Sequence, residues 1–448
     1  MKLPSGAAAP SPAPASPAGR GPAFRIPGLR WWIVGLLFLA SAKNYLDRQT
    51  LSILAPTIQK DLHISEVSYG NIVNLFLVAY GLAYLVSGRL TDWLGTRLSM
   101  VVFMSWWSVA GMLTAVARSA ASLGGVRFLL GLGEAGNYTV APKVVAEWFQ
   151  PKERGLAIGI YTLGATIGAT AAPLLIVGLN ERWGWQVTFA VIGATGFIWL
   201  VPWLWLYYRP QEHPRITAAE RALVPPASPA PPVGAARETE WSRWKAVLTR
   251  RDVWLLLGAR MVTDPVWYFY QFWLAKYLYS VRHVDQKELS ITWVVYLAAD
   301  IGTLGGGLLS GLLVKRGTTP MSSRLWAMLA CACVVPLSAL VPVAPSVGLA
   351  LACSMAVVLA HMAWLINVSA LVVDAIPQRI IGTAFGVVAA GSTFGGVLMN
   401  EVVKRLATSG HYETWFIVMA CLHPLVWLAL WGARVHRPAA AVTSDAIS

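Results

Sequence analysis

The chain has 448 residues, of which 56% are hydrophobic and only 12% are charged. Soluble domains carry about 25% charged residues, so this composition excludes an ordinary soluble enzyme and is typical of an integral membrane protein. The net charge of +14 would suit a nucleic-acid-binding protein. Most of the cations, however, lie between or at the ends of apolar stretches. This distribution excludes nucleic acid as a partner and indicates that the partner is the lipid bilayer.

Residues 1–29 are rich in Pro, Ala and Ser and lack the apolar core of a signal peptide, which predicts a disordered cytoplasmic tail. About twelve apolar stretches follow, each near the length of about 20 residues that a membrane-spanning helix needs. The predicted spans cover 30–56, 67–90, 97–117, 122–148, 155–179, 185–208, 253–279, 290–314, 324–343, 346–371, 380–404 and 412–435.

A polar segment divides these spans into two equal sets. Residues 209–251 are basic and contain a Pro-rich run, which predicts a cytoplasmic linker between two bundles. The predicted N-terminal six-helix bundle covers 30–208 and the C-terminal one covers 252–435, followed by a cytoplasmic tail at 436–448. The fold class is therefore all-α and integral to the membrane.

The positions of Lys and Arg predict the orientation in the membrane. With both termini in the cytoplasm, about 22 of them fall in inner segments and about 8 in outer ones, as the positive-inside rule requires. The chain is expected in the cell (inner or plasma) membrane. The four cysteines lie in predicted spans and are interpreted as packing residues, so no metal site is predicted.

Ionisable residues inside the first and fourth spans are the main functional signal. Each costs about 2.5–3.5 kcal/mol to insert, so a chain keeps one only with a partner or a role. The first span contains Lys43, Asp47 and Arg48, and the fourth contains Arg127 and Glu134. At 1.5 Å per residue, Asp47 and Arg127 lie at a similar depth. The sequence predicts an Asp47–Arg127 pair and a contact of Glu134 with Arg48 or Lys43.

Two interpretations of these charges stay open: ion pairs that hold two helices together, or a transport site. For transport, Glu134 and Asp47 are the candidate proton-coupling residues, because burial and nearby cations act on a carboxyl pKa in opposite directions. Arg48 and Arg127 are the candidate grips for a carboxylate, which a guanidinium binds through two hydrogen bonds. Lys43 suits either task. Further substrate-binding candidates in this half are Asn44, Tyr80 and Tyr84.

In the second half, Arg260 and Asp264 are one helical turn apart, and Asp300 lies in the next span. An Arg260–Asp264 pair or an Arg260–Asp300 bridge is expected rather than direct substrate contact. Pro265 predicts a kink, because proline removes a helix hydrogen bond. Tyr268 and Gln271 are candidates to bind substrate hydroxyls. His361 is either a titrating cavity residue or a packing residue.

The loop after the second span reads Gly88-Arg-Leu-Thr-Asp92-Trp-Leu-Gly95-Thr-Arg97, and the loop after the eighth span repeats its glycines and cations without the acid. Glycine allows close helix approach there, and Asp92 can accept hydrogen bonds from a neighbouring helix N-terminus. This motif resembles the signature of major facilitator superfamily transporters. The resemblance implies two bundles of inverted repeats around a central cavity.

A narrower resemblance rests on Asn44-Tyr-Leu-Asp47-Arg48, on Arg127 to Glu134 and on Glu147-Trp-Phe-Gln-Pro-Lys-Glu153-Arg154. These residues look like the anion:cation symporter branch, and Arg260, Asp264-Pro265, Asp300 and His361 are similar to hexuronate permeases. In the resembled fold, spans 1 and 4 line the cavity. At the span-5 position of Gly164, galactonate-type relatives carry an amide.

The sequence thus predicts a proton-coupled uptake transporter for a small organic anion, a hexuronate or related sugar acid. A proton gradient supplies the energy, no cofactor is expected, and the protein is expected to function as a monomer. An exporter of amphipathic compounds and a non-transporting membrane sensor are the alternatives. No Walker loop or Gly-x-Ser-x-Gly turn is present, and no enzyme activity is expected.

Overall fold

The computed structural model describes residues 25–224, 240–377 and 380–433, and within these ranges the chain forms helices and no β-strand. The predicted all-helical fold is confirmed, and eight helical segments are long and apolar enough to cross a membrane. The Pro-rich run at 225–233, residues 1–24 of the N-terminal tail and the whole C-terminal tail lie outside the described residues. The N-terminal half contains α1 (Leu29–Asp61), α2 (Glu66–Leu113), α3 (Ala120–Glu134), α4 (Asn137–Trp148) and α5 (Pro151–Leu206). The C-terminal half contains α8 (Arg251–Thr263), α9 (Pro265–Phe272), α10 (Leu274–Ser280), α11 (Trp293–Lys315), α12 (Pro320–Val334), α13 (Val347–Ala375), α14 (Ile381–Ser409) and α15 (Tyr412–Gly432).

Two of these helices are interrupted by a glycine in a left-handed conformation. Gly95 breaks α2 with a φ of 76°, and Gly184 breaks α5 with the same φ. Other residues adopt such an angle only with strain, so glycine is needed at both turns. The breaks fall between predicted spans 2 and 3 and between predicted spans 5 and 6. The division into twelve spans itself stays a prediction.

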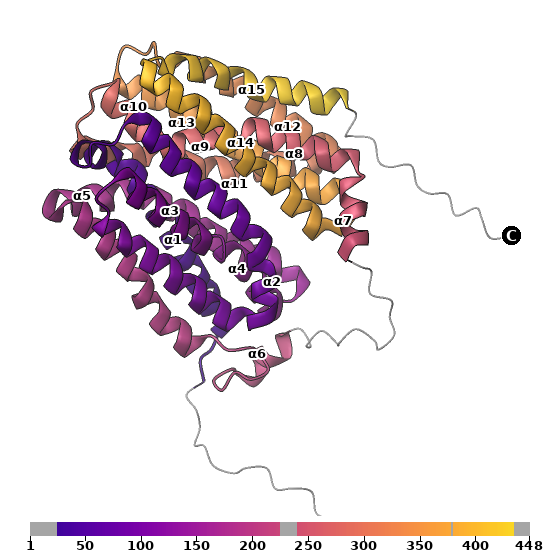
Figure 1. Ribbon diagram of the computed structural model, residues 1–448. Helices are drawn as coiled ribbons and strands as arrows, with labels where there is room; N and C mark the ends of the chain where they lie inside the picture. The colour runs from indigo at the N-terminus through magenta and orange to yellow at the C-terminus, as the bar shows by residue number, and fades with distance from the viewer. Residues whose placement is uncertain (1–24, 225–239, 378–379, 434–448) are drawn as a thin grey trace, which may run out of the picture.

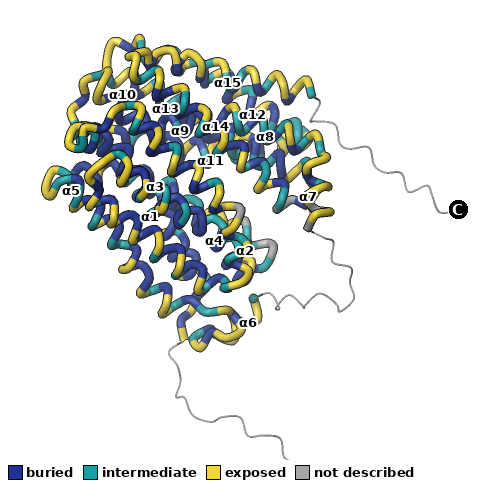
Figure 2. The backbone as a smooth tube through the Cα atoms, in the orientation of Figure 1, coloured by how far each residue is buried: buried dark blue, intermediate teal, exposed yellow. Residues whose placement is uncertain are grey.

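The helices form two bundles, one from α1–α5 and one from α8–α15 (Figure 1). Buried residues face the inside of each bundle and the interface between them, whereas exposed residues cover the outer faces (Figure 2). Large apolar side chains within predicted spans, such as Ile198 and Leu308, are exposed. An apolar outer face is expected where the surrounding medium is lipid rather than water.

Across the interface, α2 packs on α14 and α5 packs on α11. Most polar contacts between the described parts of the bundles lie toward the end where α1 meets α2. Tyr69 donates to the Phe272 carbonyl over 2.7 Å, and Lys276 pairs with Glu66. Further contacts there are Tyr296–Gln49, Gln286–Ile53, Asn400–Gly70, Asn400–Asn74, Lys404–Asn71, Asn74–Glu401 and Lys276–Gln59. Thr170–Asp300 joins the bundles about midway between the start of α5 and its break at Gly184. Toward α6 and α7, no hydrogen bond or ion pair joins the bundles within the described ranges.

The predicted linker contains two short helices, α6 (Ala218–Leu223) and α7 (Glu240–Leu248), which the sequence analysis did not anticipate. Thr217 caps α6 by accepting from the Glu220 backbone N–H, an arrangement that satisfies an otherwise free donor. Glu220 in turn accepts from the Arg30 backbone N–H over 2.9 Å and so ties α6 to the start of α1. The α6 part of the linker is therefore attached to the N-terminal bundle, whereas α7 packs on α8 and α14 of the C-terminal bundle.

Gly164 lies where α5 crosses α1 at close range. A Cβ at this position would be 2.1 Å from the Phe38 carbonyl oxygen. We expect Gly164→Ala to destabilise the protein by about 1–3 kcal/mol, because an overpacked core must shift. Gly159 on the same helix has nothing within 4 Å of its Cβ position, so Gly159→Ala is the matched control. Thermal unfolding in detergent measures both, and equal midpoints would show that the α1–α5 approach is not tight.

Candidate functional site

A cavity of about 250 Å³ lies between the two bundles. At about 30 Å³ per water molecule, it has room for a small solute. The N-terminal bundle contributes Tyr45, Arg48, Tyr80, Tyr84, Tyr138, Thr162, Ala165, Thr166 and Ala169. The C-terminal bundle contributes Arg260, Asp264, Trp267, Tyr268, Gln271, Tyr296, Ala299, Thr303, His361, Met362, Leu365, Ile366, Ala389, Ser392 and Thr393. Counting Arg, Lys, Asp and Glu, three of these described lining residues are charged: Arg48, Arg260 and Asp264.

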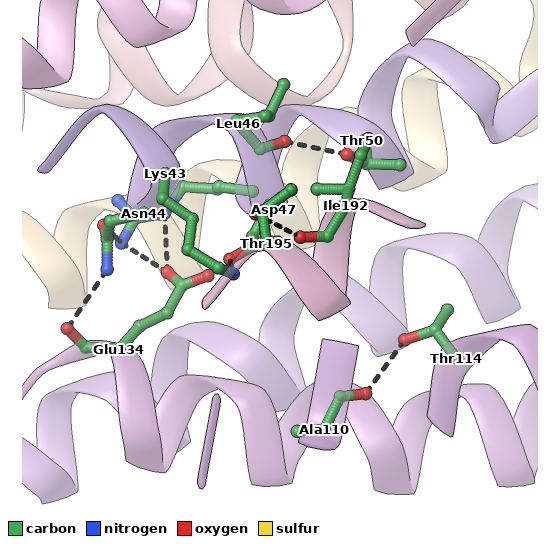
Figure 3. Close-up of polar contacts among 11 residues, drawn as sticks. Lys43, Asn44, Leu46, Asp47, Thr50, Ala110, Thr114, Glu134, Ile192 and Thr195 are labelled. Carbon is green, nitrogen blue, oxygen red and sulfur yellow. Dashed lines mark hydrogen bonds and ion pairs between the residues drawn. The ribbon is translucent and has the colours of Figure 1, made fainter. Parts of the chain in front are cut away.

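Arg48 is held at the cavity wall by Glu134. Its Nε and Nη2 donate to the same carboxylate oxygen of Glu134, over 3.2 Å and 2.9 Å. Glu134 is the last residue of α3, and the chain resumes as α4 only at Asn137. The break frees the Glu134 carbonyl, which accepts from the Asn44 side chain over 3.2 Å (Figure 3). The predicted contact of Glu134 with Arg48 is therefore confirmed, and Asn44 braces it.

Aromatic rings surround the Arg48 guanidinium. Its central carbon lies 5.2 Å from the ring centres of Tyr45 and Phe76 and 4.7 Å from that of Tyr80. Rings at such distances attract a cation and hold the planar group in place. The second oxygen of Glu134 is buried and has no hydrogen-bond partner among the described residues. One carboxylate oxygen of Glu134 is thus hydrogen-bonded to Arg48, and the other has no described hydrogen-bond partner.

The predicted Asp47–Arg127 pair is wrong. Asp47 pairs with Lys43, which lies one helical turn earlier on α1 (Figure 3). Residues four apart on one helix are neighbours, so Lys43 reaches the carboxylate without a second helix. Arg127 packs its guanidinium 5.1 Å from the ring centre of Phe189, and its Nε and Nη2 have no described partner. A similar depth does not determine which way a side chain points.

These three charged residues also lie outside the cavity lining. Lys43, Asp47 and Arg127 are buried within the N-terminal bundle, with exposed fractions of 6%, 4% and 2%. The expectation that Lys43 and Arg127 face the cavity is therefore wrong for this structure. Asn44 and Glu134 likewise stand behind the wall, and Arg48 reaches it in front of them.

On the opposite wall, Arg260 pairs with Asp264 as the sequence predicted. Arg260 Nε and Nη2 both approach Oδ2 of Asp264, over 2.8 Å and 2.7 Å. The helix is interrupted here, since α8 ends at Thr263 and α9 begins at Pro265, in agreement with the kink predicted at Pro265. Asp300 is not part of this pair, because it accepts from Thr170 of the N-terminal bundle over 2.9 Å.

Tyr80, Tyr84, Tyr268, Gln271 and His361 line the cavity, so their predicted positions agree with a binding role, which itself stays a prediction. The cavity is also lined by Tyr138, Thr162 and Thr166 of the N-terminal bundle, which were not predicted from the sequence.

Behind His361 lies a second histidine that the sequence analysis also missed. The His361 Nδ1 is 3.1 Å from Nε2 of His423 on α15. The two residues are 62 positions apart in the chain, and no spacing rule connects them.

The loop motif forms its own contacts away from the cavity. Lys143 pairs with Asp92 over 2.6 Å and donates to the Gly88 carbonyl over 2.8 Å. Asp92 thus accepts from a side chain rather than from a helix N-terminus. Arg97 follows the turn at Gly95, donates to the Leu204 carbonyl over 2.6 Å and stacks over Tyr208. The motif ties the α2 break to α4 and to the end of α5.

A sequence profile described as Major Facilitator Superfamily matches residues 37–400. The chain belongs to the Major Facilitator Superfamily. It is a multi-pass membrane protein of a transporter family and not an enzyme.

Among its relatives, the "Hexuronate transporter" of Escherichia coli (strain K12) is 30% identical over 94% of this chain and 98% of its own length. The "Galacturonate transporter" of Dickeya chrysanthemi is 30% identical over 65% of this chain and 84% of its own length. The fold is similar to that of a bacterial homologue of the human lysosomal transporter Spinster in an inward-facing, unoccupied conformation. That likeness has a TM-score of 0.72 at 18% identity and covers 91% of this chain and 99% of the other.

Proposed function

We propose that this Major Facilitator Superfamily member takes up a hexuronate or related sugar acid together with protons. One observation carries the proposal: the cavity wall presents Arg48, and a buried carboxylate, Glu134, occupies two of its donors. A guanidinium is suited to bind the carboxylate of a sugar acid, and the surrounding hydroxyl groups are suited to its hydroxyls. The printed names of the two relatives, hexuronate and galacturonate transporters, support the same substrate class.

The coupling follows from competition for Arg48. While Glu134 is ionised, it holds Nε and Nη2 of the guanidinium. A proton on Glu134 removes that charge and leaves Arg48 as a buried cation without a partner, which costs about 3–5 kcal/mol. A substrate carboxylate then restores the balance by binding Arg48. Proton and substrate therefore favour each other, as symport requires.

Asp47 is proposed as a second proton-coupling residue that acts on the same helix. Its partner Lys43 lies on α1 just before Asn44, which contacts Glu134. Protonation of Asp47 would free Lys43 and alter the charge behind Arg48. Arg127 has no ion-pair partner among the described residues and is proposed to act through its charge on this cluster rather than by touching the substrate.

With both termini placed in the cytoplasm, the end where α1 meets α2 is the outer one. Most polar contacts between the described parts of the bundles lie toward that end, so we infer that the cavity is closed to the outside and opens toward the cytoplasm. Uptake would require these contacts to break and the other end to close. We place the protein in the inner membrane as a monomer, with the proton gradient as its energy source and no cofactor.

Counterflow in proteoliposomes tests the proposed function directly. Vesicles loaded with unlabelled galacturonate are expected to take up labelled galacturonate without any ion gradient. An imposed pH gradient, acidic outside, should then drive accumulation, whereas a Na⁺ gradient should not. Failure to exchange any uronate, or exchange of amphipathic cations instead, would overturn the proposal.

A further inference from the structure

The wall formed by the C-terminal bundle carries several buried polar atoms that have no hydrogen-bond partner among the described residues. They are Oδ1 of Asp264, both side-chain amide atoms of Gln271 and Nε2 of His361. All three residues line the cavity, and their exposed fractions are 3%, 0% and 0%. Buried polar groups are almost always hydrogen-bonded in proteins. These atoms are therefore expected to bond with whatever fills the cavity.

The charge of this wall differs from that of the wall opposite. Arg260 gives both of its close contacts to Oδ2 of Asp264, so the two charges neutralise each other. Besides the Arg260 guanidinium, this wall presents Oδ1 of Asp264, an acceptor on an anionic carboxylate, and the Gln271 amide, which both donates and accepts. Across the cavity stands Arg48, a cation whose partner Glu134 lies behind the wall. The cavity thus has one cationic pole and one neutral pole that is rich in acceptors.

We propose that Asp264 selects sugar acids with a single carboxylate and rejects the corresponding dicarboxylates. This inference rests on the proposed function, in which Arg48 binds the first carboxylate. A substrate hydroxyl at the opposite pole can donate to Oδ1 of Asp264, and Gln271 and His361 satisfy further hydroxyls. A second carboxylate has no proton to donate, so it would place acceptors against Oδ1 in a buried site and leave both groups without a hydrogen bond, which is strongly unfavourable.

Removing the Asp264 charge should reverse this selection. In Asp264→Asn the guanidinium of Arg260 loses its anionic partner and becomes a free cation at the cavity wall. The two walls then each present a guanidinium, and a dicarboxylate can bridge them. The same change weakens the binding of a hydroxyl end, because an amide oxygen is a poorer acceptor than a carboxylate.

The decisive measurement compares galacturonate with galactarate. Galactarate is the diacid in which a second carboxylate stands in place of the aldehyde group of galacturonate. Each compound is added unlabelled at increasing concentration, and its inhibition of the exchange of labelled galacturonate is measured. For the wild-type protein, galactarate should compete at least about ten-fold more weakly than galacturonate. Equal competition by the two compounds would overturn the inference while leaving the proposed function intact. If the protein exchanges no uronate, the proposed function itself fails, and the two failures are distinguishable.

Asp264→Asn should shift the galactarate-to-galacturonate ratio by about ten-fold or more toward the diacid. Asp374→Asn is the matched control, because it removes a carboxylate of the same bundle that pairs with Arg324 over 3.5 Å and does not line the cavity. An unchanged ratio in folded Asp264→Asn would overturn the assignment. If that variant does not fold, Asp264→Ser removes the same charge, and the wild-type ratio still tests the selection independently.

Discussion

Arg48→Ala should abolish detectable binding of the sugar acid. Arg48 is the single cation that the described N-terminal bundle presents to the cavity. Truncating one member of a buried charge pair costs about 2–5 kcal/mol of binding free energy. That range corresponds to about a 30-fold or greater rise in the dissociation constant. Calorimetric titration of galacturonate into the purified protein measures it. Wild-type affinity in the variant would place the carboxylate site elsewhere.

The same substitution also leaves Glu134 without its partner, so stability must be separated from binding. An unpaired buried carboxylate costs about 3–5 kcal/mol, which would lower the midpoint of thermal unfolding. The double variant Arg48→Ala with Glu134→Gln removes both charges and should regain most of that stability without regaining affinity. This separates a missing grip from a damaged fold.

Arg127→Ala is the informative comparison. Its guanidinium is as buried as that of Arg48, but it packs on Phe189 behind the wall and does not line the cavity. The variant should therefore retain far more affinity than Arg48→Ala does. Equal loss in both would mean that the two arginines bind the substrate together, as the sequence alone suggested.

Position along the chain was enough to predict some of this site because helix rise converts sequence position into depth. The breaks at Gly95 and Gly184 fall between predicted spans, and Glu134 meets Arg48 at the expected level. The Arg260–Asp264 pair was equally accessible, since four residues make one turn.

Rotation about the helix axis was not available from the sequence. It decides that Asp47 meets Lys43 rather than Arg127, and that Arg48 reaches the cavity while Asn44, one turn away, contacts the Glu134 carbonyl. The His361–His423 contact joins α13 to α15 and depends on tertiary packing alone. The cavity lining depends in the same way on how the two bundles meet, so Tyr138 and Thr166 became visible only in the structure.

Glu134→Gln should separate exchange from energy coupling. Glutamine matches the shape of protonated Glu134, cannot bind or release a proton, and carries no charge to hold Arg48. Exchange of labelled galacturonate without a gradient should therefore continue, whereas accumulation driven by a pH gradient should be lost. If one proton moves with each substrate, a gradient of one pH unit supports about ten-fold accumulation in the wild-type protein. The variant should equilibrate without concentrating the substrate.

The control for this experiment is Glu153→Gln. Glu153 pairs with Arg30 over 2.7 Å near the start of α5 and does not line the cavity, so its loss should leave the accumulation intact. Undiminished accumulation by Glu134→Gln would remove proton coupling from Glu134. Asp47→Asn then tests the second proposed proton-coupling residue. Asp47 lies on α1 between its partner Lys43 and Arg48, and Arg48 also contacts Asn44 on this helix. Loss of both exchange and accumulation in Glu134→Gln would instead mean that the carboxylate is needed to position Arg48, and the competition for its guanidinium would no longer explain symport.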